Sequence, residues 1–308
     1  MNIITKADKK RRRVVAIGMW DGVHRGHRFL IDYLILEGRN RRLTPSVVTF
    51  SDHPLRIVDP ERAPRLLTAI NDRMDLLGAA GVEDAIVLSF NERMRHQTAR
   101  KFLERLHKSF GVDLLVVGFN NRFGHNRKGS LEEYREIGRE IGLEVIGAPE
   151  FKGTDEAVSS SVIRDYLAKG DVVKAAELLG RPYTLRGIVV EGNRLGRTLG
   201  FPTANVRPTS ELTIVPGNGV YAVTVTTPDG IRRPAVLNIG HRPTVSAEHD
   251  AAGEGPVSIE VHIPDFTGYL YDDELAIEFD RRLRDEKQFD SLEALKKAIA
   301  ADVRSLKK

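Results

Sequence analysis

The fold of the first half of the chain is decided by one stretch, residues 14–27, which reads VVAIGMWDGVHRGH. Its first four residues, Val14 to Ile17, form a continuous apolar run, as in strands that are buried on both faces of a sheet. A turn with glycines follows, and from Phe29 to Leu34 apolar residues recur at the spacing of a helix. A buried strand that leads through such a turn into a helix is typical of a βα unit in a parallel sheet.

The same alternation continues outward to about residue 150. Further strands are predicted over residues 46–50, 85–88, 114–117 and 144–146, and further helices over 70–80, 98–110 and 131–141. Continuous apolar strands separated by helices predict a parallel sheet with helices on both faces. The first half is therefore assigned to the α/β class.

The pattern changes after Gly180, beyond two more predicted helices at 160–168 and 172–179. Short strands are then predicted over 185–190, 220–225, 235–239, 259–263 and 275–279, and a last amphipathic helix over 292–306. Pro228-Asp229-Gly230 is a hairpin signal, and residues 246–255 are expected to form a mobile loop. We therefore expect two domains, 1–180 and 181–308, the second a small antiparallel β-barrel with a terminal helix.

The composition excludes several classes of protein. The 308-residue chain has no cysteine, which rules out disulfides, thiolate zinc sites and a cysteine nucleophile. No apolar run reaches the roughly 18 residues of a membrane span, and no signal-peptide core follows the basic run Lys9–Arg13. The net charge of +4 is small for this length, so we expect that run to be a solvated tail. We expect a cytoplasmic protein with no nucleic-acid or membrane partner.

Two histidines, His24 and His27, stand where the first strand passes into its helix. Ligands bind at the carboxyl ends of such strands, and a helix N-terminus there offers free N–H groups to phosphate oxygens. Gly26 would let the backbone approach a triphosphate closely. Two imidazoles could donate hydrogen bonds to charge that builds up on an attacked phosphorus. Taken alone, the pair is more often a cap and a core residue, and a zinc site fits less well because the spacing is not His-Glu-x-x-His.

Two other segments of the first half carry groups that suit phosphate. Three consecutive hydroxyls, Ser159 to Ser161, open a predicted helix that also carries Arg164. Asn120 and Arg122 follow the fourth predicted strand. We expect these groups to join the histidines at one edge of the sheet.

A second stretch with chemical content covers residues 192–205 and reads GNRLGRTLGFPTAN. Its glycines and arginines could form a loop around a polyphosphate, although a glycine-arginine loop by itself is usually an ordinary hairpin. Thr203 and Asn205 are two residues apart, so in an extended segment both side chains point to one side. A hydroxyl and an amide oxygen of this kind suit Mg²⁺.

Together these motifs resemble a known family. The first half resembles the His-x-Gly-His nucleotidyltransferases in residues 17–27 (IGMWDGVHRGH), 49–54 (TFSDHP), 118–124 (GFNNRFG) and 158–164 (VSSSVIR). The second half resembles riboflavin kinases in residues 200–205 (GFPTAN), 238–244 (NIGHRPT) and 284–289 (RDEKQF). Over roughly Val14 to Leu306 the chain is similar to the bacterial bifunctional riboflavin kinase/FAD synthetases.

The resemblance implies two reactions. A Rossmann-like N-terminal domain would transfer the adenylyl group of ATP to FMN, giving FAD and pyrophosphate. A C-terminal barrel would transfer the γ-phosphoryl group of ATP to riboflavin, giving FMN and ADP. Mg²⁺ is the implied cofactor and ATP the co-substrate, and no bound redox cofactor is expected because flavins are substrate and product.

The resemblance also implies roles for individual residues. The implied catalytic groups are His24, His27 and Arg164 in the first reaction and Glu260, as the base, in the second. Metal binding is implied for Thr203 and Asn205, and flavin binding for Arg284 and Phe289, although these last two could instead form a salt bridge and core packing. Binding of ATP or its phosphates is implied for Gly18, Asp21, Gly26, Asn120, Ser160, Ser161, Gly192, Arg197 and Gly200.

Several residues depart from the family pattern and keep alternatives open. Met19 and Trp20 replace residues that are usually smaller or phenylalanine, Asp52 replaces a common proline, Asn121 a usual aromatic residue and Ser161 a threonine. Phe119 and Asn121 bear most on flavin and adenine contacts. One alternative is a riboflavin kinase with an inactive first module, and another is a non-enzymatic flavin- or RNA-binding regulator. We expect a monomer or a weak homo-oligomer, and assign no role to His53, His241 or His262.

Overall fold

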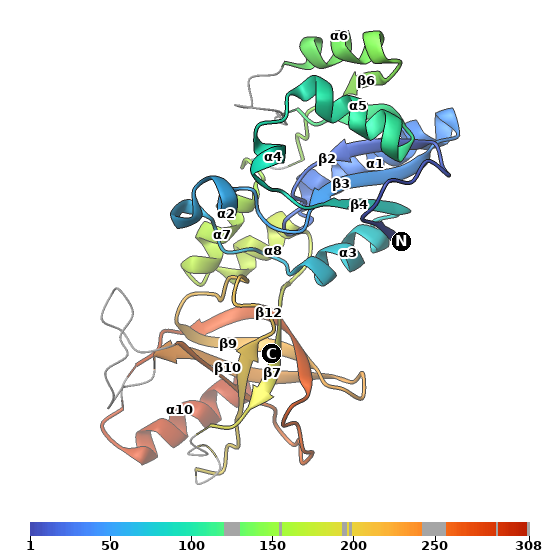
Figure 1. Cartoon of the computed structure of the whole chain (residues 1–308). Helices are drawn as coiled ribbons and strands as arrows, with labels where there is room; N and C mark the ends of the chain where they lie inside the picture. Colours follow the sequence, from blue (N-terminus) through green and yellow to red (C-terminus); the bar gives the residue numbers. More distant parts are fainter. Residues whose placement is uncertain are drawn as a thin grey trace. The chain divides into compact units, whose positions relative to one another are not determined.

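The computed structural model describes residues 1–119, 130–153, 156–192, 196, 199–241, 257–287 and 289–306, the side chain of His241 excepted. By its internal contacts the chain divides into two compact units, Met1–Ser159 and Ser160–Lys308. Figure 1 shows the first as a sheet between helices and the second as a barrel with helices beside it. The predicted loop at 246–255 lies outside the described residues.

The first unit is built on a six-stranded sheet in the order β1-β4-β3-β2-β5-β6, and every pair of neighbours is parallel. The strands are β1 (Asn2–Ile4), β2 (Arg13–Ile17), β3 (Thr44–Phe50), β4 (Asp84–Leu88), β5 (Val112–Val117) and β6 (Glu144–Gly147). The chain proceeds from β2 to β3 and β4 on one side and returns to β5 and β6 on the other. The strand order therefore reverses between β2 and β5, and ligands bind beyond the carboxyl ends at such a point.

Four long helices cover the two faces of this sheet. They are α1 (Arg25–Arg41), α3 (Ile70–Ala79), α5 (Ala99–Phe110) and α6 (Leu131–Ile141). Val14 and Ala16 of β2 pack in one core cluster with residues of α1 and α3, whereas Val15 and Ile17 pack in another with residues of α5 and α6. Alternate residues of one strand thus serve opposite faces, which confirms the predicted α/β architecture.

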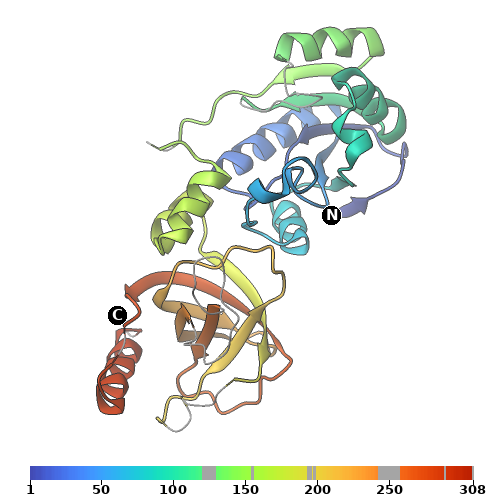
Figure 2. The ribbon, with the colours of Figure 1, turned by 60° about the vertical axis from the view of Figure 1, so that its left-hand side comes forward.

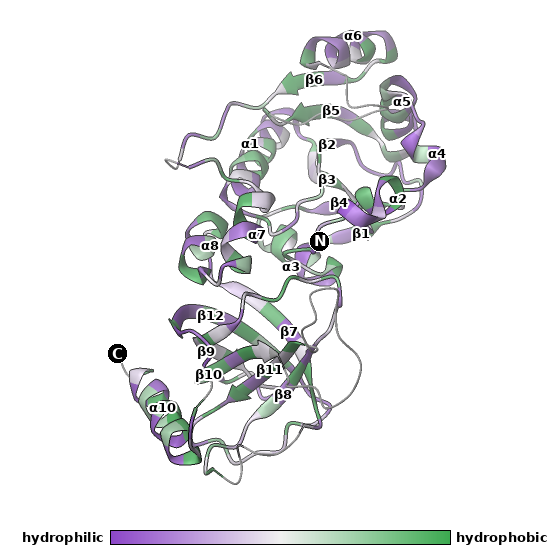
Figure 3. Ribbon diagram, turned by 90° about the vertical axis from the view of Figure 1, so that its left-hand side faces the viewer, coloured by the Kyte–Doolittle hydropathy of each residue, from purple (hydrophilic) through white to green (hydrophobic). Residues whose placement is uncertain are grey.

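Two of the predicted helices begin at residues whose side chains cap them. Thr98 caps α5 by accepting a hydrogen bond from the backbone N–H of Lys101, and Ser130 caps α6 in the same way. In Figure 3, α6 carries both apolar and polar residues, as a helix with one buried face should. The short elements α2 (Leu55–Val58), α4 (Glu92–Arg95) and the 3₁₀ turn Pro60–Arg62 were not predicted.

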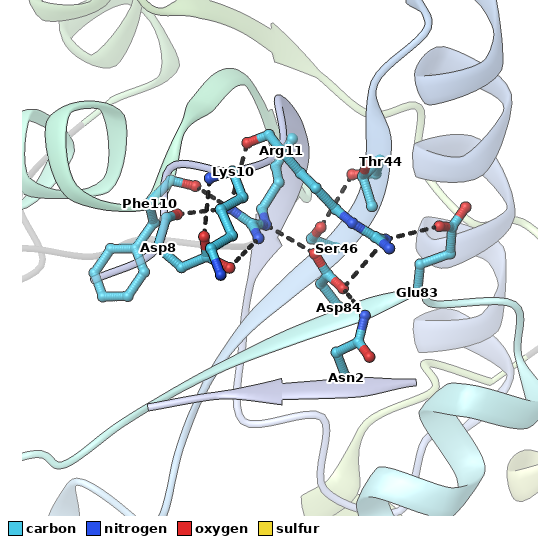
Figure 4. A network of polar contacts seen from close by, with 10 residues as sticks. Asn2, Asp8, Lys10, Arg11, Thr44, Ser46, Glu83, Asp84 and Phe110 are labelled. Atoms are coloured by element: carbon cyan, nitrogen blue, oxygen red, sulfur yellow. Dashed lines mark hydrogen bonds and ion pairs between the residues drawn. The ribbon is translucent and has the colours of Figure 1, made fainter. Parts of the chain in front are cut away.

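The N-terminal basic run is part of the fold, so the prediction of a solvated tail is wrong for its last residue. Arg13 is fully buried at the start of β2 and forms ion pairs with Asp84 (2.9 Å) and Asp8 (3.0 Å). It also donates to the carbonyl oxygens of Asp8 (2.8 Å) and Phe110 (2.6 Å). Figure 4 shows these groups gathered with Asn2, whose amide donates to Asp84.

The barrel of the second unit is closed and antiparallel throughout, in the order β10-β11-β8-β7-β12-β9. Its strands are β7 (Tyr183–Val190), β8 (Ala204–Pro208), β9 (Gly219–Thr226), β10 (Arg232–His241), β11 (Val257–His262) and β12 (Glu274–Arg284). The terminal helix α10 (Leu292–Ser305) lies beside the barrel in Figure 2. The predicted barrel and terminal helix are confirmed, and so is the hairpin turn, in which Gly230 N–H donates to Thr227 O (2.8 Å).

Two helices precede the barrel, α7 (Ser160–Ala168) and α8 (Val172–Leu179). The contact division assigns both to the second unit, whereas the sequence placed the boundary near residue 180. The reason is local: α8 packs against β7 and β12, and Gly217 N–H donates to Leu167 O of α7 (2.8 Å). None of the helices in the described part of the chain is both long and apolar enough to span a membrane.

Candidate active sites

The turn between β2 and α1 is strained. Trp20 (φ 55°) and Val23 (φ 39°) both adopt left-handed backbone conformations, which non-glycine residues rarely do and β-branched ones almost never. Such strain persists only where surrounding contacts hold it, and it concentrates at functional sites. This turn therefore marks the carboxyl end of β2 as the candidate site of the first unit.

Asp21 is one of the groups that hold the turn. Its carboxylate accepts hydrogen bonds from the backbone N–H groups of Leu67 (2.9 Å) and Thr68 (3.1 Å), and only 1% of the residue is exposed. The Thr68 hydroxyl in turn accepts from Gly22 N–H (3.1 Å). Asp21 thus fastens the turn to the segment before α3, and its implied role in phosphate binding stays a prediction.

Trp20 and Gly18 fasten the same turn to β3. The indole Nε1 of Trp20 donates to Val48 O (3.2 Å), and Gly18 N–H donates to the same oxygen (3.0 Å). Trp20 is buried, and its ring lies 5.2 Å from the ring of His27, centroid to centroid. A phenylalanine at this position could not make the indole hydrogen bond.

The two histidines of the motif form a stacked pair. His24 is the N-cap of α1, its Nδ1 accepts from His27 N–H (3.3 Å), and the rings lie 3.6 Å apart with 13° between their planes. Gly26 lies between them in the first helical turn. Burial lowers the pKa of His27 well below its ordinary value of 6.5, and the charges of His24 and Arg73 lower it further. The site therefore presents His27 as a neutral ring at physiological pH.

Arg73 is a polar group at this site that sequence reasoning missed. It lies on α3, is fully buried, and donates from Nη1 to Met19 O (2.9 Å) in the strained turn. Its only signal in the sequence is a charged residue on a buried helical face, three residues after Ile70. A basic residue on a helix usually faces solvent, so this signal is weak.

The remaining residues predicted for the first reaction belong to the second compact unit or lie outside the described residues. Ser160, Ser161 and Arg164 open α7, which belongs to the second compact unit. Asn120 lies outside the described residues, and Phe119 before it is exposed. Their roles in ATP binding stay predictions.

In the second unit three polar side chains form a row across neighbouring strands. Glu260 of β11 lies opposite Asn205 of β8 and opposite Asn238 of β10. The neighbours of Glu260 along its strand, Ile259 and Val261, are buried in the barrel, so the row is on the outer side of the sheet. Directly opposed residues share a face, which brings the predicted base and a predicted metal ligand together.

Thr203 joins this row from the end of the preceding loop. Its hydroxyl donates to Glu260 Oε2 (3.3 Å), so one predicted metal ligand contacts the carboxylate and the other, Asn205, lies opposite Glu260 in the sheet. A hydroxyl, an amide and a carboxylate are hard oxygen donors of the kind that Mg²⁺ takes, with waters and phosphates as its other ligands. The donor set therefore fits Mg²⁺.

Two described glycines of the predicted phosphate loop, Gly192 and Gly196, lie close to this row. Gly192 lies against the Asn205 amide, so closely that a side chain at 192 would displace it. Gly200 has φ +82°, a conformation that favours glycine. His262, to which the sequence assigned no role, packs beside this segment: its Nδ1 lies 2.8 Å from Pro202 O, and its ring lies edge-to-face with that of Phe201. Arg197 lies outside the described residues.

The two predicted flavin contacts have protein partners of their own. Arg284, at the end of β12, pairs with Asp302 of α10 at 2.9 Å, and its guanidinium lies 5.6 Å from the Phe289 ring centroid. This ties the terminal helix to the barrel, the salt-bridge alternative noted from the sequence. His53, also left without a role, caps α2 through Nδ1, which accepts from Leu55 N–H (3.2 Å).

Comparisons with known proteins agree with this division of sites. Residues 6–162 match a family model described as FAD synthetase, and residues 179–308 match one described as riboflavin kinase. A solved structure described as a macrolide-efflux protein from Streptococcus pneumoniae superposes with a TM-score of 0.88 at 29% identity, covering 99% of this chain and 98% of that one. The two share a fold over their whole length.

Curated relatives cover nearly the whole chain. The bifunctional riboflavin kinase/FMN adenylyltransferase of Pseudomonas fluorescens is 40% identical over 94% of this chain and 90% of its own length. The proteins of the same description from Escherichia coli K12 and Bacillus subtilis are 37% and 33% identical, over 94% and 96% of this chain and 90% and 92% of their own lengths. The resemblance found in the motifs is confirmed, and the chain belongs to the family of bifunctional riboflavin kinase/FMN adenylyltransferases.

Proposed function

We propose that the chain converts riboflavin to FMN in its barrel unit and FMN to FAD in its parallel-sheet unit, with ATP as donor in both reactions. The observation that carries this proposal is that the two halves match separate models for the two activities, in family order and over nearly the whole chain. Each half also contains a site whose chemistry suits its own step.

In the kinase step, a ribityl hydroxyl oxygen of riboflavin attacks the γ-phosphorus of ATP. The new O–P bond forms as the bond to the leaving ADP breaks, and Glu260 accepts the hydroxyl proton. The hydrogen bond from Thr203 keeps one oxygen of the Glu260 carboxylate in place. Thr203 and Asn205 would hold Mg²⁺, which would neutralise phosphate charge.

In the adenylyl-transfer step, a phosphate oxygen of FMN attacks the α-phosphorus of ATP and pyrophosphate leaves. The nucleophile is already an anion, so the step requires no strong base. His24 and His27 donate hydrogen bonds to the charge that develops on the α-phosphate, a task for which a neutral imidazole N–H is sufficient. The buried, neutral state of His27 supports this role. Arg164 joins the histidines in stabilising this charge, and Ser160, Ser161 and Asn120 hold ATP.

A chromatographic time course tests both steps. Purified protein is incubated with ATP, MgCl₂ and either riboflavin or FMN, and flavins are separated at intervals. We expect FMN and then FAD from riboflavin, and FAD directly from FMN. Accumulation of FMN without FAD would leave a kinase with an inactive first module. No conversion of either flavin would overturn the proposal.

Two variants assign the steps to their sites. Glu260→Gln should abolish FMN formation and leave conversion of FMN to FAD intact. His27→Ala should do the reverse and slow FAD formation by about 100-fold or more, the usual effect of losing one donor to a developing oxyanion. Glu278→Gln, on another barrel strand, and His107→Ala, at the end of α5, are matched controls that should retain both activities. Loss of both activities in either test variant would show a structural role instead.

A further inference from the structure

Arg73 is the most incompletely paired buried side chain among the described residues. None of it is exposed, yet only Nη1 is hydrogen-bonded, and Nε and Nη2 have no partner within the described part of the chain. A buried donor without a partner destabilises the folded state, and more so when the group is charged. A position that keeps such a group requires an explanation beyond packing.

The paired nitrogen of Arg73 joins two strand ends. Nη1 donates to Met19 O (2.9 Å) in the strained turn and lies 3.3 Å from Phe50 O, at the end of β3. It also lies 3.4 Å from the Thr49 hydroxyl, which itself donates to Met19 O (3.3 Å). One guanidinium nitrogen thus holds the turn that precedes His24 against the neighbouring strand.

The same side chain brings a positive charge to the histidine pair. Nδ1 of His27 is also buried without a hydrogen-bond partner in the described residues, and Arg73 is one of the two charged neighbours that act on the ring, the other being His24. Burial lowers the pKa of Arg73, and the charges of Asp21 and Asp52 act in the opposite direction and favour its charged form. A cation beside His27 disfavours a second positive charge on the ring.

We propose that Arg73 is a positioning residue for adenylyl transfer: its hydrogen bonds to Met19 O and Phe50 O fix the strained Gly18–Val23 turn ahead of the histidine pair, without contact to substrate. Burial is the main cause of the low pKa of His27, and the charge of Arg73 acts in the same direction. This inference rests on the proposed function of the first unit. Neutrality matters because His27 has one ring proton to donate, and with Nδ1 buried and unpaired that proton belongs on Nε2. An imidazolium would carry a second proton into a buried position with no acceptor.

The test separates charge from geometry with two variants and a control. Arg73→Met removes both the charge and the hydrogen bonds, whereas Arg73→Lys keeps the charge but loses the planar fork. Arg13→Met is the matched control, since Arg13 is the other fully buried arginine of this unit and pairs at the opposite ends of the strands. Riboflavin kinase activity, which resides in the second unit, is recorded for every variant.

Ionisation of His27 can be measured without catalysis. Trp20 is the sole tryptophan and its ring lies 5.2 Å from that of His27, so its fluorescence, which an imidazolium quenches, reports protonation of the ring. Histidine NMR signals, assigned by comparison with His27→Ala, give the same titration independently. We expect the pKa of His27 to rise in Arg73→Met and to stay near the wild-type value in Arg73→Lys and Arg13→Met.

Kinetics of FAD formation from FMN supply the second readout. We expect kcat in Arg73→Met to fall by about 10–100-fold with little change in KM, because misplacing a catalytic group affects the transition state more than substrate binding. The acidic limb of its pH profile should move to higher pH, and Arg73→Lys should recover part of kcat and the wild-type pH profile. An unchanged His27 titration in Arg73→Met would overturn the charge role, and an unchanged kcat would overturn the positioning role. A wild-type protein that makes no FAD would instead refute the proposed function. The titration would still test whether the charge of Arg73 lowers the pKa of His27.

Discussion

The two ends of the parallel sheet each contain a fully buried arginine, and the two differ in how many of their nitrogens are hydrogen-bonded. At the amino ends of the strands, all three nitrogens of Arg13 are bonded, to two carboxylates and to backbone carbonyls. At the carboxyl ends, Arg73 uses one nitrogen and leaves two unpaired within the described residues. Charge, side chain and burial are the same, so the difference lies in the surroundings.

This difference separates stability from function. A buried charge that is fully bonded recovers its desolvation penalty and fixes the elements around it. A buried charge that is partly bonded keeps some of that penalty, and its field acts on nearby groups in a region of low dielectric. The strained Trp20 and Val23 backbones occur at the carboxyl end, beside Arg73 and the histidine pair. The groups at the amino ends of the strands stabilise the fold, whereas those at the carboxyl ends keep an energetically unfavourable arrangement at the candidate site.

The largest expected effect comes from replacing Arg13, whose three nitrogens are all hydrogen-bonded. Arg13→Met should lower the free energy of unfolding by about 3–5 kcal/mol, because it removes the buried ion pair of Asp84 and leaves only the exposed Arg11, 3.7 Å away. Urea denaturation followed by Trp20 fluorescence measures this loss. A decrease below about 1 kcal/mol, the value of an exposed pair, would contradict the comparison.

A smaller effect is expected at the strained end. Trp20→Phe removes the hydrogen bond from the indole to Val48 O, which is worth about 1 kcal/mol. The variant should still form FAD, because the family usually has phenylalanine or a smaller residue here. Denaturation followed by circular dichroism gives the stability, since no other tryptophan remains. Complete loss of FAD formation would show that the indole serves the reaction itself.

The smallest effect is a pH dependence at the amino end. The Lys10 backbone N–H, and then the charge of Arg13, hold the pKa of Asp8 below its ordinary value of 3.8. A lowered folded-state pKa stabilises the fold above the unfolded value, and this contribution is lost as pH falls through the folded value. The stability advantage of wild type over Asp8→Asn should therefore be complete at pH 6 and shrink below pH about 4. An advantage that is constant from pH 6 to pH 3 would contradict this.

Local patterns in the sequence were enough to predict most elements of both units. The apolar run from Val14 to Ile17 predicts a buried strand, and β2 covers it. Strands β1 and β8 were missed because the first is only three residues long and the second contains a proline and few apolar residues. Short strands of this kind are specified by their partners in the sheet, which a local pattern does not contain.

The site residues show the same limit. Thr203 and Asn205 could be paired from their spacing, but their meeting with Glu260 depends on the β8–β11 register across the barrel. Arg13 resembled a surface residue because its partner Asp84 is 71 positions away in the chain. The structural role of Asp21 could not be predicted, because nothing in its own segment reveals the Leu67 and Thr68 N–H groups. Contacts distant in sequence therefore decide between a ligand contact and a structural one.

The short strand β1 has a consequence for how this protein is handled. It pairs with β4 at the outer edge of the sheet, so that β4 does not present a free row of N–H and C=O groups on that side. Three residues are long enough to cover that edge and too short to offer a good template to another chain. A chain shortened by its first four residues would uncover β4 and become prone to edge-to-edge self-association, so affinity tags belong at the other terminus.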